Sequence, residues 1–154
     1  MNMRALVTGA AGFIGSHLVD RLLQDGQAVI AFDNFSTGQR RFLDNAQSND
    51  RFELIEGDLI CEEQIEAAMQ DVDFVWHLAA NADVRFGTDQ PRRDLEQNTI
   101  ATSNVLEAMR KNEVRHIAFS STGSIYGEAS VIPTPEDCPM PVQTSLYGAS
   151  KLAC

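Results

Sequence analysis

The sequence predicts an α/β fold built on a doubly wound parallel sheet. Apolar runs typical of strands recur at residues 5–8, 28–33, 52–57, 72–78 and 114–120, with helix-like stretches between them. This alternation is characteristic of a parallel sheet covered by helices on both faces. Because crossover connections are right-handed, few topologies remain, and the strand order 3-2-1-4-5 is favoured. The third run carries more charge than the others, which suits an edge strand.

Length and composition indicate one globular domain. The chain has 154 residues, 44% of them hydrophobic, and a net charge of −10. An acidic chain lacks the Lys/Arg excess that binding to nucleic acid or to an anionic membrane surface requires. No apolar stretch approaches the roughly 20 residues that span a bilayer, and no signal-peptide pattern precedes the first strand. We therefore expect a cytoplasmic location, with no nucleic-acid or membrane partner.

The cysteines predict neither disulfides nor a metal site. Cys61, Cys138 and Cys154 are odd in number, far apart and without Cys-x-x-Cys spacing. Unpaired thiols and no metal site are the expectation.

A glycine-rich turn follows the first strand, with the sequence Thr8-Gly9-Ala10-Ala11-Gly12-Phe13-Ile14-Gly15. Gly9 permits a tight turn, Gly12 lets the backbone approach a pyrophosphate, and Gly15 lets the next helix pack closely. Ile14, Leu18 and Leu22 are expected to form the apolar face of that helix. Its N-terminal N–H groups would face phosphates. A glycine-rich turn without a ligand is the alternative.

An acidic residue closes the second strand. Asp33 is placed to accept hydrogen bonds from the hydroxyls of an adenosine ribose and to repel a 2′-phosphate, which favours NAD over NADP. Capping of the following turn is the alternative role. Arg40 and Arg41 follow and could hold a 2′-phosphate instead.

Three further polar residues, two near predicted strand ends and one on a predicted helix, are candidates for structural or site roles. Asp58 follows the third strand, where chemistry alone favours an N-cap of the helix expected over residues 62–70. His77 on the fourth strand is expected to be structural. Asn98 lies on a helix face with Thr102, Val105 and Met109, so its buried amide must bridge strand ends or support a site, or be a simple core polar group.

The last part of the chain brings hydroxyls and an amine together. Tyr147 and Lys151 are four residues apart, so on a helix they share one face. A nearby ammonium favours the phenolate form and makes Tyr147 a plausible general base. The chain has two lysines, Lys111 and Lys151, and otherwise uses arginine.

These motifs together resemble the extended short-chain dehydrogenase/reductases, in the group of NAD-dependent nucleotide-sugar epimerases and dehydratases. The resemblance covers the whole chain and implies a Rossmann fold with a catalytic Thr122, Tyr147 and Lys151. It implies NAD as cofactor, bound by Gly9, Gly12, Phe13, Ile14, Gly15, Asp33, Asn34, Asp58, Leu59, Ala79, Ala80, Asn98, Tyr147 and Lys151. Ala82 stands where some 4-epimerases of the family have a lysine, and Arg85 is a candidate phosphate contact or a solvated side chain.

The resemblance also implies a reaction. Gly123 and Ser124 stand where the 4,6-dehydratases have an Asp-Glu pair, so a 4-epimerase acting on a UDP-hexose by transient oxidation at C4 is preferred. Another oxidoreductase, dehydratase or decarboxylase of the superfamily, or a short non-catalytic NAD-binding module, is the alternative. Since members of the family are about twice this length, we expect residues 1–154 to be the NAD-binding domain, truncated before the substrate domain. We expect the chain to be inactive alone, with an open strand edge that invites self-association, and the full-length enzyme to be a homodimer.

Overall fold

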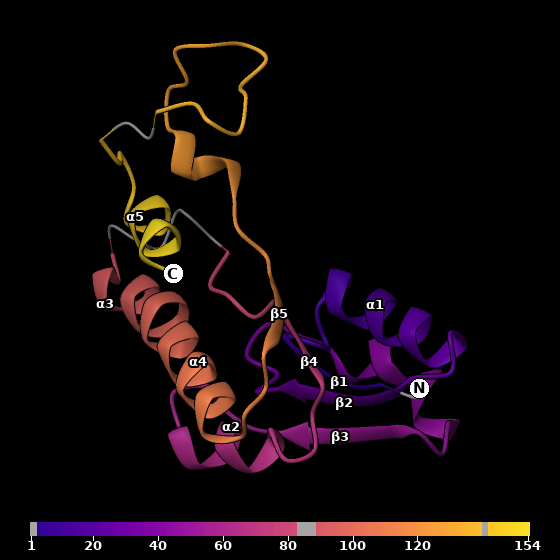
Figure 1. Cartoon of the computed structure of the whole chain (residues 1–154). Coiled ribbons are helices and arrows are strands. Elements are labelled where there is room, and N and C mark those ends of the chain that lie inside the picture. Colours follow the sequence, from indigo (N-terminus) through magenta and orange to yellow (C-terminus); the bar gives the residue numbers. More distant parts are fainter. Residues whose placement is uncertain (1–2, 83–88, 140–141) are drawn as a thin grey trace.

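A parallel sheet forms the centre of the molecule, with helices on both faces (Figure 1). The computed structural model describes residues 3–82, 89–139 and 142–154. The strand order is β3-β2-β1-β4-β5, and each pairing is parallel, as the sequence predicts. The charged third strand lies at one edge, which confirms its prediction. The strands are β1 (Arg4–Thr8), β2 (Ala28–Asp33), β3 (Phe52–Glu56), β4 (Phe74–His77) and β5 (His116–Phe119).

Helix α1 (Phe13–Gln24) covers one face of the sheet, together with the short 3₁₀ helices η1 (Arg40–Leu43) and η2 (Ala46–Ser48). Val19, Leu22 and Leu23 of α1 are buried there. The predicted apolar face was partly wrong, because Ile14 is 64% exposed. The buried stripe begins at Gly15, where α1 approaches the preceding turn closely, and Ile14 therefore lies on the solvent-facing side of the helix.

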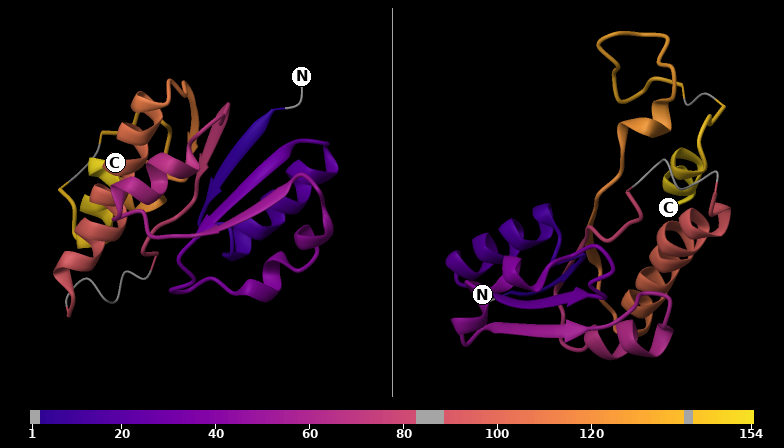
Figure 2. Two further views of the ribbon diagram at one scale, coloured as in Figure 1. Left: turned by 90° about the horizontal axis from the view of Figure 1, so that it is seen from below. Right: turned by 180° about the vertical axis from the view of Figure 1, so that it is seen from behind.

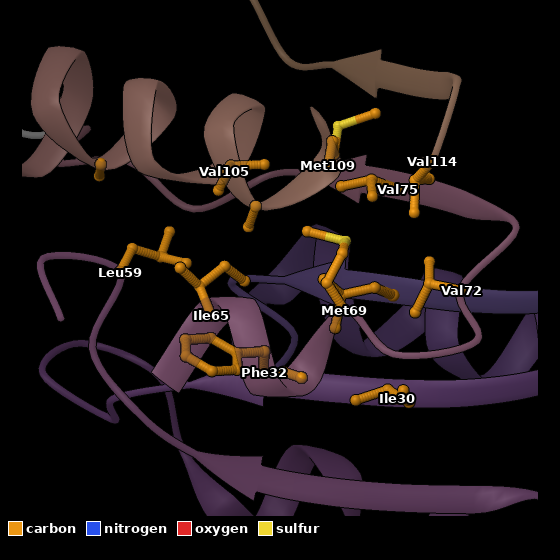
Figure 3. Packing of buried hydrophobic residues seen from close by; sticks show 14 residues of the cluster. Ile30, Phe32, Leu59, Ile65, Met69, Val72, Val75, Val105, Met109 and Val114 are labelled. Atoms are coloured by element: carbon orange, nitrogen blue, oxygen red, sulfur yellow. The ribbon is translucent and has the colours of Figure 1, made fainter. Parts of the chain in front are cut away.

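The opposite face carries the larger core, between the sheet and helices α2 (Glu62–Ala68) and α4 (Ala101–Lys111). Figure 3 shows Ile65 of α2, Met69 just after that helix and Val105 of α4 converging on Phe32 and Val75 of the sheet. Each fully buried side chain of this kind contributes about 1.5–3 kcal/mol relative to exposure. This packing holds the carboxyl ends of β1, β2 and β4 in fixed relative positions.

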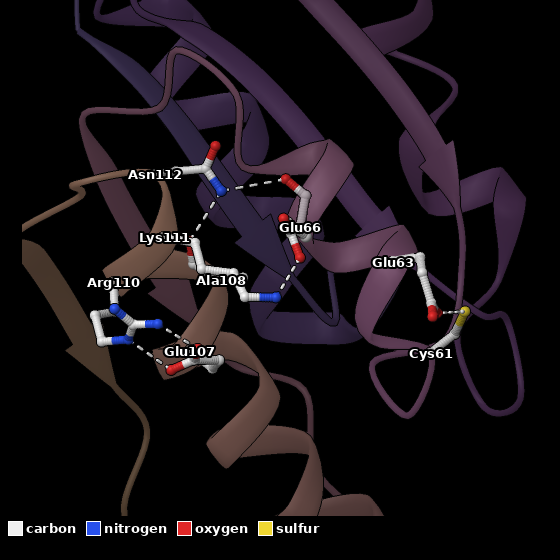
Figure 4. A network of polar contacts seen from close by, with 8 residues as sticks. All are labelled: Cys61, Glu63, Glu66, Glu107, Ala108, Arg110, Lys111 and Asn112. Atoms are coloured by element: carbon white, nitrogen blue, oxygen red, sulfur yellow. Dashed lines mark hydrogen bonds and ion pairs between the residues drawn. The ribbon is translucent and has the colours of Figure 1, made fainter.

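Polar contacts join α2 and α4 at their outer surface (Figure 4). The Nζ of Lys111 donates to Oε2 of Glu66 at 2.6 Å, and Asn112 donates to the Glu66 carbonyl at 3.4 Å. Arg110 pairs with Glu107 on the same helix. Exposed pairs of this kind are worth about 1 kcal/mol or less. Lys111 is therefore a surface residue of the helical layer, unlike the second lysine.

The helix that carries Asn98 is not a plain α-helix. It begins as α3 (Pro91–Asp94), continues as the π-helical segment η4 (Leu95–Ile100) and becomes α4. Asn98, Thr102, Val105 and Met109 are all buried, which confirms the predicted inward face. Wider π-helical turns occur often at functional sites, and no pattern in the sequence predicted this one.

After β5 the chain reaches away from the sheet and returns (Figures 1 and 2). The outgoing part includes the 3₁₀ helix η5 (Gly123–Tyr126), and the returning part ends in α5 (Leu146–Ala153), which packs against α3 and η4. The three cysteines are unpaired, as predicted. Within the described ranges, no helix has the length and apolar character needed to cross a membrane.

Candidate functional site

A pocket of about 150 Å³ opens at the carboxyl ends of β1, β2, β3 and β4. Strand order reverses beside β1, and such switch points are where doubly wound sheets bind ligands. Eight residues predicted to contact a cofactor line this pocket: Gly9, Gly12, Asp33, Asn34, Asp58, Leu59, Ala79 and Ala80. Ser36, Thr37, Gly38 and Gln97 also line it and were not predicted. Asn34, Asp58 and Ala80 border a wider hollow toward α3 as well.

The glycines of the turn have distinct geometric roles. Gly9 has φ +68°, and a Cβ there would lie 2.8 Å from the backbone nitrogen of Ala79. A Cβ on Gly15 would overlap the carbonyl oxygen of Gly9. The turn is therefore pressed between β4 and α1, and any larger residue at either position displaces one of them.

The N-terminus of α1 faces the pocket without a side-chain cap. Its N-cap is Gly12, and no side chain accepts from the first N–H groups, which leaves donors and a partial positive charge for an anion. Phe13 is 74% exposed beside this end. Phe13 and Ile14 thus flank the turn as exposed apolar surface, and their contact with a cofactor stays a prediction.

Asp33 ties the end of β2 to the glycine-rich turn. One carboxylate oxygen accepts the N–H of Ala11 and the other accepts the N–H of Phe35, each at 2.8 Å. The second contact is the turn cap that was weighed as the alternative role for Asp33. Gly38 packs against the same carboxylate, since a Cβ there would lie 2.9 Å from its Oδ1. Each oxygen keeps a lone pair for a ligand hydroxyl.

Asn34 and Asp58 meet across the ends of β2 and β3, where Nδ2 of Asn34 donates to Oδ2 of Asp58 at 3.2 Å. The predicted N-cap role of Asp58 was wrong. Its Oδ1 accepts the N–H of Ile60 in a tight turn, and α2 begins later, with Cys61 as its N-cap. The turn holds the Asp58 carboxylate at the pocket instead of at the helix.

Arg40 is engaged at the rim, which bears on the choice between NAD and NADP. Its guanidinium pairs with Glu56 and lies over the ring of Phe35, 4.1 Å from the centroid. Arg41 lies over Phe42. In this arrangement Arg40 already has an anionic partner, Glu56. Its guanidinium is therefore less available to a 2′-phosphate than the sequence alone suggested.

His77 is fully buried at the end of β4. Its Nδ1 lies 2.7 Å from Oγ1 of Thr8, and its Nε2 lies 3.0 Å from Oγ1 of Thr102. Burial, reinforced by the nearby Lys151 charge, lowers the pKa of the imidazole to about 4. The structural role expected for His77 is confirmed: a neutral ring joins β1, β4 and α4.

Asn98 links the loop after β4 to α5. Its Oδ1 accepts the N–H of Asn81 at 2.8 Å, and its Nδ2 donates to Oγ of Ser150 at 2.9 Å. These contacts are with protein, and it is the neighbouring Gln97 that lines the pocket. The amide thus bridges and supports the site, while its contact with a cofactor stays a prediction.

The Tyr147–Lys151 pair lies on α5, in successive turns of one helix. Lys151 is 4% exposed, and burial lowers the pKa of its ammonium. Within the described part of the chain, this ammonium has no hydrogen bond or ion pair; it contacts the ring of Phe119. A buried cation without an acceptor is a group that a ligand hydroxyl would satisfy.

Thr122 is the N-cap of η5, and η5 lies against α5. The Oγ1 of Thr122 accepts the N–H of Ser124 at 3.2 Å, and a Cβ on Gly148 would lie 3.3 Å from the carbonyl oxygen of Ser124. The η5 segment that follows Thr122 thus packs beside Gly148, the residue after Tyr147. Arg85 lies outside the described residues.

The fold and this site define the Rossmann class of nucleotide-binding domain, extended by a helix that carries a Tyr-x-x-x-Lys pair. An uncapped helix N-terminus, a turn in which side chains do not fit and an acceptorless ammonium together match a dinucleotide with phosphates and ribose hydroxyls.

Comparison with known proteins gives the same assignment. Residues 5–154 match the family described as "NAD dependent epimerase/dehydratase family", and the chain belongs to that family. It is 41% identical over 155 residues to the UDP-glucose 4-epimerase of Mycolicibacterium smegmatis, covering 98% of this chain and 49% of the relative. It is 38% identical over 134 residues to UDP-glucuronic acid decarboxylase 1 of Danio rerio, covering 87% and 31%.

A solved structure agrees in three dimensions. The complex of Thermus thermophilus UDP-glucose 4-epimerase with NAD has a TM-score of 0.82 and 38% identity, covering 98% of this chain and 48% of that one. The chain thus spans about half the length, or less, of the relatives it matches.

Proposed function

We propose that residues 1–154 form the NAD-binding domain of a nucleotide-sugar epimerase that acts on a UDP-hexose by transient oxidation at C4. The observation that carries the proposal is the placement of an acceptorless, buried Lys151 on the helix of Tyr147, in a domain whose glycine turn and Asp33 share one pocket. The Mycolicibacterium and Thermus relatives support the choice of substrate and cofactor.

The cofactor would be held by residues of the pocket at the carboxyl ends of β1, β2, β3 and β4. The N–H groups of α1 would bind the pyrophosphate, Asp33 would accept from the adenosine ribose, and Asp58 with Asn34 would border the adenine. When bound, NAD supplies the hydride acceptor and donor. Asp33 would repel the 2′-phosphate of NADP.

Residues of the chain itself would carry out the proton transfer. Tyr147 takes the proton of the sugar 4-hydroxyl as a general base, and the Lys151 ammonium favours the phenolate form that this role needs. Thr122 hydrogen-bonds the reacting oxygen. After the 4-keto sugar has turned over in the site, Tyr147 would return the proton to the 4-oxygen as the hydride returns to the other face of C4, so the epimerisation has no net redox change.

The decarboxylase relative from Danio rerio makes a related oxidoreductase the second candidate. A product assay separates the two, because an epimerase interconverts UDP-glucose and UDP-galactose, whereas a decarboxylase releases CO₂ from a UDP-sugar acid. A dehydratase is disfavoured by Gly123 and Ser124, which offer no acid–base pair. A short non-catalytic module would bind NAD and convert no sugar.

Two measurements test the proposal. Calorimetric titration of the 154-residue chain should show binding of NAD in preference to NADP. The protein as its gene encodes it should interconvert the two UDP-hexoses, and Tyr147→Phe should abolish turnover while NAD still binds. Retained turnover in that variant would refute the role of Tyr147. Homodimeric assembly and a cytoplasmic location remain predictions for the same full-length protein.

A further inference from the structure

Phe119, at the end of β5, contacts the structural His77 and the predicted catalytic Lys151. Phe119 and His77 are register neighbours on β5 and β4, and their rings stack with centroids 5.7 Å apart at an interplanar angle of 29°. The Nζ of Lys151 lies over the same phenyl ring, 4.1 Å from its centroid. One aromatic ring therefore connects the sheet to the amine of α5.

The ring contact matters because Lys151 has so few others. Lys151 is 4% exposed, and in the described ranges its ammonium makes no hydrogen bond or ion pair, so the Phe119 ring is the group that it contacts directly. An aromatic face attracts a cation electrostatically, and more strongly where water is excluded. Without the ring, the flexible four-carbon chain would have no group to hold its charged end in place.

His77 keeps Phe119 in place without adding charge. Both imidazole nitrogens are occupied, by Thr8 and Thr102, so the orientation of the ring is fixed. The imidazole pKa of about 4 keeps it neutral at physiological pH. Burial lowers the pKa of the Lys151 ammonium, and an electrostatic interaction with Cys154 partly offsets this effect; Tyr147 lies one helical turn away.

We propose that Phe119 is a positioning residue, whose ring holds the Lys151 ammonium at its working place before any ligand arrives and is itself fixed by His77. The proposal rests on the proposed function in one respect, since the group that would be bound more tightly is a ribose of NAD. A preplaced ammonium binds such a ligand more tightly because less side-chain freedom is lost on binding.

The first experiment tests the contact in the absence of any ligand. The chain has two lysines, so NMR resonances of the side-chain methylene groups can be assigned with Lys111 as internal reference. Protons above an aromatic ring shift upfield, so we expect an upfield shift for Lys151 and none for Lys111. Phe119→Leu should abolish the shift, and Phe119→Tyr should retain it. Unshifted Lys151 resonances in the unmodified chain would overturn the proposal, even if a variant fails to fold.

The second experiment tests the consequence for binding. Phe119→Leu should raise the Kd for NAD about 2- to 30-fold, the range expected for loss of a cation–π contact, and Phe119→Tyr should restore it. Phe74→Leu is the matched control, because Phe74 is also half-buried and stacks on a histidine, His116, at the opposite end of the sheet. Equal Kd values for the Leu and Tyr variants would overturn the positioning role. Absence of NAD binding by the unmodified chain would refute the proposed function, while the NMR result would still decide the contact.

Discussion

The carboxylate of Asp33 accepts the backbone N–H of Ala11 at 2.8 Å, which fastens the end of β2 to the glycine-rich turn between β1 and α1. The residue expected to select the cofactor therefore also holds the loop that would bind its phosphates. Stability and affinity are coupled at this position.

Replacing Asp33 should affect both properties. Asp33→Ala leaves the N–H groups of Ala11 and Phe35 without their acceptor, which should cost about 1–3 kcal/mol of unfolding free energy, measured by urea denaturation. The Kd for NAD should rise, and the preference over NADP should shrink. The exposed Asp44→Ala is the control and should leave both unchanged. An unaltered NAD/NADP ratio for Asp33→Ala would contradict the selectivity role.

Gly15 should not tolerate the smallest side chain. Gly→Ala within a helix ordinarily stabilises by about 1 kcal/mol, but here the Cβ would overlap the Gly9 carbonyl. Gly15→Ala should therefore destabilise by about 1–3 kcal/mol through overpacking and weaken NAD binding. Gly123→Ala is the matched control, since nothing lies within 4 Å of its Cβ. Thermal unfolding of both variants decides the comparison, and a stabilised Gly15→Ala would be incompatible with this geometry.

Truncation of Asn98 should lower the free energy of unfolding, because its amide joins the loop after β4 to α5. Asn98→Ala leaves the buried N–H of Asn81 unpaired and frees Ser150, which should cost about 2 kcal/mol or more. Asn112→Ala, at the end of the same helical segment and half-buried, should cost less, about 1 kcal/mol. Amide hydrogen exchange should show faster opening of α5 in the Asn98 variant alone. Equal exchange in both variants would argue against the bridging role.

His77 should make the protein less stable in mild acid. The pKa falls from 6.5 in the unfolded chain to about 4 in the fold, so the unfolded state binds the proton first. The neutral ring contributes its full stabilisation above pH 6.5. As the pH falls toward 4 this stabilisation is lost, and the free energy of unfolding decreases by about 3 kcal/mol. His77→Gln should reduce the dependence of the unfolding free energy on pH between pH 4 and 6.5, measured by denaturation at several pH values. The exposed His116→Gln should leave this dependence unchanged. Parallel slopes for the two variants would exclude His77 as the source.

The sequence was sufficient to predict the sheet order, the glycine-rich turn, Asp33 at the end of β2 and the inward face of Asn98 and Thr102. The sheet order follows from the alternation of elements and from right-handed crossovers. The other features depend on local spacing, because a period of 3.6 or 2 and the position of a glycine are properties of neighbouring residues. The same local reasoning failed at Ile14 and at Asp58. There the close approach of α1 to the turn and the tight turn at Ile60 overrode the periodicity and capping preferences.

The tertiary structure alone decided which side chains meet across long stretches of sequence. The contacts of Phe119 with Lys151 and His77, of Asn98 with Ser150 and of Arg40 with Glu56 depend on strand register and on how α5 returns to α3 and η4. The π-helical turn at Asn98 belongs to the same group. Such partners are fixed by packing between elements, which one-dimensional spacing does not specify, so the environment of the Lys151 ammonium became visible only in the folded chain.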